Sequence, residues 1–178
     1  MPRLFTGIEI PAEIALALSA FRGGLPGARW VDPENYHLTL RFIGDIDDRM
    51  AEDVTTILGE RRRRAPLTIT LDGLDTFGGA KPRTVFARTS GNGELNELQT
   101  EQERLLRQVG LPPETRKFTP HVTLARLRNV SPMDVADYIA VRGHFPKLTF
   151  TADRFVLYSS RNSVGGGPYI VEAAYPLS

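Results

Sequence analysis

Apolar residues recur at every second position in several short segments of the chain, a spacing typical of β-strands with one buried face. Together with short continuous apolar runs, these segments predict strands at residues 4–10, 36–43, 67–71, 84–87, 121–127, 145–150, 154–158 and 169–173. Trp30 and Val31 form a further short extended piece. We expect the last two strands to be joined by a loop that contains the run 165–168, Gly-Gly-Gly-Pro.

Four other segments have apolar residues at helical spacing or begin with helix-capping residues. The first helix starts at Pro11, continues through Phe21 and stops at the glycines 23–24. The second runs from an aspartate cap at 47 or 48 towards residue 58, and the third covers 94–109. A serine cap at 131 and the proline after it start the fourth. Strands and helices therefore alternate along the chain, which predicts mixed α/β or α+β architecture.

The sequence contains one internal echo. The tetrapeptide His37-Leu38-Thr39-Leu40 recurs as His-Val-Thr-Leu at residues 121–124, which is 84 residues later (121 − 37) and close to half the chain. Only three histidines are present, and two of them begin this pattern. Two similar lobes that face each other would bring both copies into one central cleft.

The spacing within each copy has a mechanical meaning. Residues i and i+2 of a strand point to the same face, so His37 and Thr39 share one face, and His121 and Thr123 share another. One neutral imidazole can take a proton from water while a protonated one gives a proton to a departing ribose oxygen. Threonine hydroxyls can donate to the phosphate oxygens on which charge accumulates. The pattern therefore suits hydrolysis of a cyclic phosphodiester, and this scheme requires no metal.

Composition and charge narrow the alternatives. The 178 residues include no cysteine, which excludes a disulfide framework, a thiolate zinc site and a cysteine nucleophile, and fits a reducing compartment. We expect a cytoplasmic protein, because no secretory signal or membrane-length apolar stretch is visible. The 22 basic and 21 acidic residues give a net charge of +1, whereas proteins that coat long duplexes are usually far more basic. A small phosphorylated substrate or the end of an RNA strand needs only a local positive pocket.

With these residues in place, the chain resembles the two-histidine (2H) phosphoesterases, and within them the RNA 2′,3′-cyclic phosphodiesterases, historically called 2′-5′ RNA ligases. The resemblance covers nearly the whole chain. Its two signatures are residues 34–44, Glu-Asn-Tyr-His-Leu-Thr-Leu-Arg-Phe-Ile-Gly, and residues 118–126, Phe-Thr-Pro-His-Val-Thr-Leu-Ala-Arg. Residues 3–5 with Ile8 are similar to the opening strand of the family, residues 82–83 with 86–87 to its middle strand, and residues 157–160 to its final hairpin.

The resemblance implies an α+β fold in which two pseudo-twofold-related lobes of antiparallel sheet, with outer helices, surround a central cleft. Residues 1–178 would form this single bilobal phosphoesterase domain. It also implies hydrolysis of a terminal 2′,3′-cyclic phosphate to a 2′-phosphate, with His37 as proton donor and His121 as proton acceptor. RNA ends or cyclic-phosphate nucleotides are then the partners, no cofactor or metal is expected, and we expect a monomer that does not bind membranes.

The neighbouring side chains leave some questions open. Arg126 lies five residues after His121, so an ideal strand places it on the opposite face, and phosphate contact requires a twist or bulge. Phe42 has the same wrong parity relative to His37, so we expect it in the core and not beneath a base. Alternative functions are ligation or cleavage of a 2′-5′ linkage, hydrolysis of a small nucleotide such as an ADP-ribose derivative, and a non-catalytic RNA-end or nucleotide-binding module.

Overall fold

The computed structural model describes residues 3–142, 144–160 and 167–178. Within them, the strands form one nine-stranded sheet with antiparallel pairing throughout. The strands are β1 (Arg3–Glu9), β2 (Ala28–Trp30), β3 (His37–Asp45), β4 (Leu67–Phe77), β5 (Thr84–Thr89), β6 (His121–Leu127), β7 (Leu148–Ala152), β8 (Arg154–Ser160) and β9 (Tyr169–Pro176). The helices are α1 (Ala12–Ser19), the 3-10 helix η1 (Pro33–Asn35), α2 (Asp48–Leu58), α3 (Gly93–Gln108) and α4 (Pro132–Arg142).

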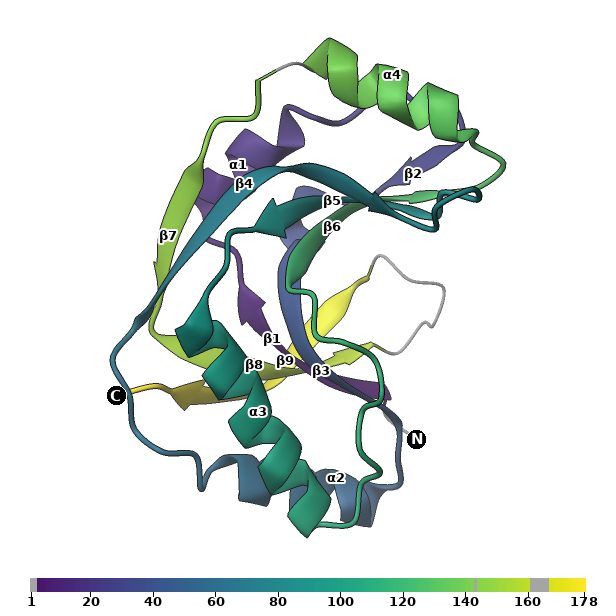
Figure 1. The fold of residues 1–178 in the computed structure, drawn as a ribbon. Coiled ribbons are helices and arrows are strands. Elements are labelled where there is room, and N and C mark those ends of the chain that lie inside the picture. Colours follow the sequence, from purple (N-terminus) through teal and green to yellow (C-terminus); the bar gives the residue numbers. More distant parts are fainter. Residues whose placement is uncertain (1–2, 143, 161–166) are drawn as a thin grey trace.

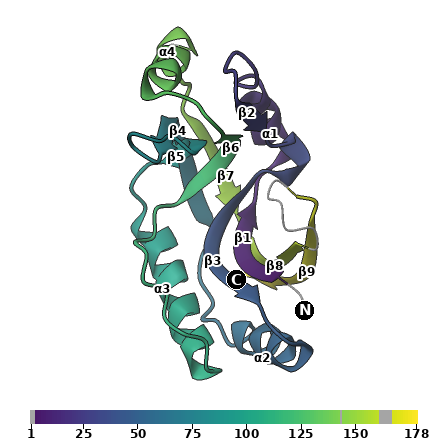
Figure 2. The ribbon, with the colours of Figure 1, turned by 90° about the vertical axis from the view of Figure 1, so that its right-hand side faces the viewer.

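The order of the strands is symmetric about the centre of the sheet. It runs β7-β4-β5-β6-β3-β1-β8-β9, and β2 pairs with β6 outside this path. The two halves meet where β6 lies beside β3 (Figure 2). In each half a helix follows the second strand from the centre (α1 after β1, α3 after β5), and another follows the central strand (α2 after β3, α4 after β6). The α+β class and the two-lobed arrangement are therefore as expected from the alternation of strands and helices and from the family resemblance.

Each half of the sheet is covered by a helix that belongs, in sequence, to the other half. The helix α3 follows β5 but contacts β3 and α2, and α1 follows β1 but contacts β7. Figure 1 shows this exchange, with α1 and α4 near the top and α2 and α3 together at the bottom. The principal hydrophobic core accordingly includes residues from both halves, such as Leu38, Leu58, Ile69, Leu98 and Val122.

The junction between the halves is short. A single register pair, Leu38 with Val122, joins β3 to β6, and both side chains are fully buried. The residue before each of them is the histidine of the repeat. The two histidines therefore lie at the point where the halves touch, and burial of their apolar neighbours anchors both strands there.

The predicted elements differ from the observed ones mainly at their ends. The helix expected to run through Phe21 ends at Ser19, because the next three amides bond to the third carbonyl before them and the last turn tightens to 3-10 geometry. The strand expected at 67–71 continues to Phe77 across an irregularity at Leu71–Gly73. Asp47 and Ser131 cap α2 and α4 as expected. In the predicted loop at 165–168, Gly165 and Gly166 lie outside the described residues. None of the described helices is both long and apolar enough to span a membrane.

Candidate active site

Both histidines of the repeat are fixed through the same ring nitrogen. The Nδ1–H group of His37 donates to the carbonyl of Asn35 at 2.9 Å, and that of His121 donates to the carbonyl of Thr119 at 2.6 Å. A carbonyl oxygen only accepts, so each Nδ1 must carry the proton when the ring is neutral. This leaves Nε2 of both rings as the atom that can gain or lose a proton.

Aromatic side chains from neighbouring strands surround each imidazole. The ring centroid of His37 lies 5.0 Å from Phe5, 5.6 Å from Tyr158 and 4.7 Å from Tyr169. That of His121 lies 4.9 Å from Phe77 and 5.1 Å from Phe86. These contacts restrict the orientation of both rings and remove water from around them.

Burial biases both rings towards the neutral form. It lowers the pKa of His37 to about 4, although the hydrogen bond to Asn35 partly opposes this, and the nearby His121 and Arg126 lower it further. Burial also lowers the pKa of His121, against the hydrogen bond to Thr119 and with a further contribution from Arg126. Near neutral pH the free protein therefore holds two uncharged imidazoles, and an anion between them would raise the pKa of each.

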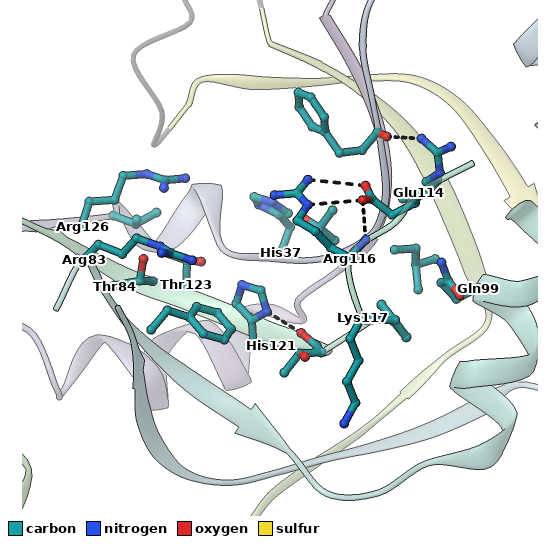
Figure 3. A pocket seen from close by; sticks show the side chains of 18 of the residues that line it. His37, Arg83, Thr84, Gln99, Glu114, Arg116, Lys117, His121, Thr123 and Arg126 are labelled. Carbon is teal, nitrogen blue, oxygen red and sulfur yellow. Dashed lines mark hydrogen bonds and ion pairs between the residues drawn. The ribbon is translucent and has the colours of Figure 1, made fainter. Parts of the chain in front are cut away.

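The two histidines line one pocket of about 370 Å³. Thr39 and Thr123 line it too, so the structure brings together the four side chains predicted from the repeat. Figure 3 shows Thr123 and Thr84 on one side of His121, with Arg83 and Arg126 above them. Two imidazoles, hydroxyl groups and guanidinium groups around one space form an arrangement suited to a phosphate ester.

A bulge follows the threonine in each copy of the repeat. In β3, Thr39 pairs with Gly7 and Arg41 with Thr6, so Leu40 is the additional residue. In β6, Thr123 pairs with Phe86 and Ala125 with Val85, so Leu124 is the additional residue. One additional residue reverses the alternation of side chains beyond it.

The reversed alternation determines which face of the sheet Arg126 and Phe42 occupy. Arg126 lines the pocket together with His121, as the bulge alternative requires. Phe42, 84 residues earlier at the corresponding place in β3, also lines the pocket and is 42% exposed. The expectation that Phe42 lies in the core is therefore wrong, because the ideal alternation on which it rested is interrupted at Leu40.

Several polar residues of the pocket were not predicted from the sequence. Arg83 and Thr84 enter from the start of β5, and Arg116 and Lys117 from the segment before β6. Arg116 is bound to Glu114 at 3.3 Å, whereas Arg83 and Arg126 have no ion pair within the part of the chain that the structure describes. Only the register of β5 against β6 brings Arg83 here, and no local pattern in the sequence indicates that pairing.

The pocket adjoins a buried ion pair that holds the far side of β3. Arg41 is 6% exposed, and its guanidinium donates to Glu103 at 2.7 Å and to the carbonyl of Pro112 at 2.5 Å. Its charge is thus balanced within the protein. Among the described residues, no group of three or more histidine, cysteine, aspartate or glutamate side chains is arranged to hold a metal ion.

The model of the 2′-5′ RNA ligase superfamily matches residues 10–163, which include both histidines and the bulged strands. The chain belongs to this superfamily. It is a superfamily of two-histidine (2H) phosphoesterases, and that name describes the pair found in the pocket.

Curated relatives within the superfamily carry the name RNA 2′,3′-cyclic phosphodiesterase. The protein from Thermotoga maritima is 30% identical over 175 residues, 95% of this chain and 92% of its own length. The one from Aeropyrum pernix is 39% identical over 107 residues, 59% of this chain and 60% of its own length. The matches to Aeropyrum pernix and Geobacillus stearothermophilus thus span 60% and 41% of those relatives, less than two thirds of either.

Solved structures of the superfamily have the same fold. Escherichia coli LigT complexed with 3′-AMP is 26% identical, superposes with a TM-score of 0.78, and is aligned over 100% of this chain and 99% of its own. The protein TT0787 of Thermus thermophilus is 25% identical with a TM-score of 0.80, over 98% and 97% of the two chains. Membership of the superfamily thus agrees in sequence and in three dimensions.

Proposed function

We propose that the protein is a hydrolase that opens the terminal 2′,3′-cyclic phosphate of RNA to a 2′-phosphate, with paired histidines and without a metal ion. The observation that carries this proposal is that two histidine rings line one pocket in the same way. Each ring donates its Nδ1–H to a carbonyl two residues earlier, which leaves its Nε2 available for proton transfer. Relatives named RNA 2′,3′-cyclic phosphodiesterase support the choice of substrate.

The chemistry needs one proton acceptor and one proton donor. Nε2 of His121 takes a proton from water, whose oxygen attacks phosphorus. The bond between phosphorus and the ribose 3′ oxygen breaks, and Nε2–H of His37 gives its proton to that oxygen. Thr39, Thr123 and Arg126 bind the non-bridging oxygens, where negative charge grows. The division of roles between the histidines follows the family resemblance, since the geometry treats them alike.

The bound phosphate prepares the donor. In the free protein, the pKa of His37 near 4 leaves its ring mostly neutral at pH 7. The negative charge of the phosphodiester favours the imidazolium and raises that pKa on binding. The ring thus becomes an acid only when a substrate is present. The exposed ring of Phe42, on the same face of the bulged strand, provides a surface on which the terminal base stacks.

Alanine variants test the two histidines with a matched control. His37→Ala and His121→Ala should each lower kcat/KM on an RNA with a 2′,3′-cyclic end by at least ~10²-fold, the usual contribution of general acid–base catalysis. His144, the third histidine, does not line this pocket, so His144→Ala should retain wild-type activity. All assays are run with a large excess of chelator, and the phosphate position of the product is read by NMR.

The outcomes separate this function from its alternatives. Full activity in both variants would leave a non-catalytic RNA-end or nucleotide-binding module. Activity lost to chelator and restored by one divalent ion would contradict the metal-free mechanism. Joining or cleaving 2′-5′ linkages faster than opening the cyclic phosphate would favour the ligation alternative, and a preference for cyclic phosphates of ADP-ribose type would replace RNA as the substrate.

A second substrate separates donor from acceptor. A cyclic phosphate analogue with a very acidic leaving group needs little protonation of that group, so it should rescue His37→Ala far more than His121→Ala. Equal rescue of both variants would show that the assignment of donor and acceptor is wrong.

A further inference from the structure

A second cavity opens beside the catalytic pocket. It measures about 240 Å³ and shares three lining residues with that pocket, Val31, Asn35 and Arg126. Its other lining residues come from β2, from the segment that joins β2 to η1, from η1 and from the two residues before β9: Arg29, Trp30, Asp32, Glu34, Gly167 and Pro168. Arg126 thus stands between the two spaces, and a ligand that fills one can continue past it into the other.

Two arginines face each other in this cavity. The register of β2 against β6 pairs Arg29 directly with Arg126, so both side chains leave the same face of the sheet. Like charges in directly opposed positions destabilise a strand pair. In the part of the chain that the structure describes, neither guanidinium has a carboxylate partner. An anion held between the two guanidinium groups would remove this repulsion and accept hydrogen bonds from both.

We infer that this side cavity binds the phosphodiester that links the last two nucleotides of an RNA strand. The inference rests on the proposed function, which places the terminal cyclic phosphate between the histidines. The catalytic pocket holds the last nucleotide, and the strand continues past Arg126 to bring its next phosphate between Arg29 and Arg126. A mononucleotide cannot reach this position, so the cavity favours oligonucleotide ends over free cyclic nucleotides.

The acidic residues of the cavity fit this placement. Asp32 is bound to Arg22 at 3.4 Å, so its charge is partly balanced by that residue. Glu34 is exposed and has no ion pair with a described residue, so it opposes an anion in the cavity. Arg29 and Glu34 therefore act on the same phosphate with opposite signs, and substitutions at the two positions should have opposite effects.

Arg29→Ala tests the subsite with two substrates measured side by side. On an oligonucleotide with a 2′,3′-cyclic end, kcat/KM should fall about tenfold, as expected for one charge-assisted phosphate contact. On the matching 2′,3′-cyclic mononucleotide it should stay within about twofold, because Arg29 does not line the catalytic pocket. Arg29→Lys should recover part of the loss, which excludes misfolding as its cause.

Two more variants sharpen the test. Arg128 lies just beyond the end of β6, is exposed and lines neither cavity, so Arg128→Ala measures the effect of removing a nearby charge without the subsite. The salt dependence of oligonucleotide turnover should lose a slope of about 0.7 in Arg29→Ala, the value for one phosphate contact with a single strand, and should be unchanged in Arg128→Ala. Glu34→Gln should improve oligonucleotide turnover and leave that of the mononucleotide unchanged.

Binding can be followed without turnover, since Trp30 is the only tryptophan in the sequence and lines the cavity. Binding of a dinucleotide that ends in a 2′-phosphate should change the fluorescence of Trp30, whereas binding of the corresponding mononucleotide should not.

If wild type cleaves both substrates but Arg29→Ala affects them equally, or no more than Arg128→Ala does, the subsite is overturned and the proposed function stands. If wild type cleaves neither substrate, the proposed function fails, and the fluorescence comparison alone decides the subsite.

Discussion

The imidazole of His37 is packed among the rings of Phe5, Tyr158 and Tyr169, and this packing has a consequence for stability as well as for catalysis. The folded protein protonates this histidine only near pH 4, whereas the unfolded chain protonates it near 6.5. Between these values the unfolded chain binds more protons, so the free energy of unfolding must fall as the pH falls.

We therefore expect wild type to lose stability relative to His37→Gln as the pH is lowered from 6.5 to 4. The difference in unfolding free energy should reach at most roughly 3 kcal/mol, at about 1.36 kcal/mol per unit of pKa difference, and should level off below pH 4. Urea unfolding of both proteins at several pH values measures it. His144→Gln, at an exposed position, is the control and should follow wild type. Parallel curves for wild type and His37→Gln would contradict the buried, neutral state of the ring.

At the scale of the element, the bulge in β3 is held by a hydroxyl from the neighbouring strand. Thr6 of β1 accepts a hydrogen bond from the amide of Arg41 at 3.1 Å and donates to Oε1 of Gln102 at 2.5 Å. Thr6 and Gln102 are both fully buried, so neither can exchange these bonds for water. The equivalent residue opposite the bulge in β6 is Val85, whose side chain offers no hydrogen bond.

Thr6→Val should remove this support with little change in volume. It leaves the amide of Arg41 and the buried amide side chain of Gln102 without their partner, so the free energy of unfolding should fall by about 1–3 kcal/mol. Thr151→Val, at an exposed position in β7, should change it by no more than about 0.5 kcal/mol. Urea unfolding at pH 7.5 compares the two. Equal stability of the two variants would mean that the hydroxyl does not hold the bulge.

At the scale of the whole molecule, the exchanged helices tie the two halves together. Removal of α3 would uncover β3 and α2, and removal of α1 would uncover part of β7, so neither half keeps its apolar surface buried alone. One principal core contains residues of both halves. We therefore predict that the chain, which the family resemblance implies is one bilobal domain over residues 1–178, unfolds as a single cooperative unit.

Equilibrium unfolding in urea should therefore show one transition. The fluorescence of Trp30 reports the region around β2 and β6, and far-UV circular dichroism reports all elements, so the two midpoints should coincide. Two separated midpoints would show that the halves unfold independently. The monomeric state that the sequence predicts is tested on the same sample by sedimentation, which should give a mass near 19.8 kDa.

The local sequence pattern determined the positions of most strands and helices and of the central site residues. Alternating apolar positions, capping residues such as Ser131, and glycine and proline boundaries located most strands and helices, because these preferences act over a few residues. The repeated tetrapeptide identified the four side chains His37, Thr39, His121 and Thr123, because residues i and i+2 of a strand share a face whatever the rest of the fold does. The two-lobed arrangement was expected from the family resemblance that the repeat carries.

Tertiary structure decided everything that depends on pairing between distant segments. Pairing with β1 and β5 shows that β3 and β6 each carry an additional residue, Leu40 and Leu124. These two bulges direct the side chains of Phe42 and Arg126 towards the pocket. The register of β2 against β6 brought Arg29 opposite Arg126 across 97 positions of sequence (126 − 29). The low pKa of His37 arises from rings that lie on β1, β8 and β9. Strand register, burial and charge environment depend on residues that are close in space but distant in sequence. A local pattern in one strand therefore contains no information about them.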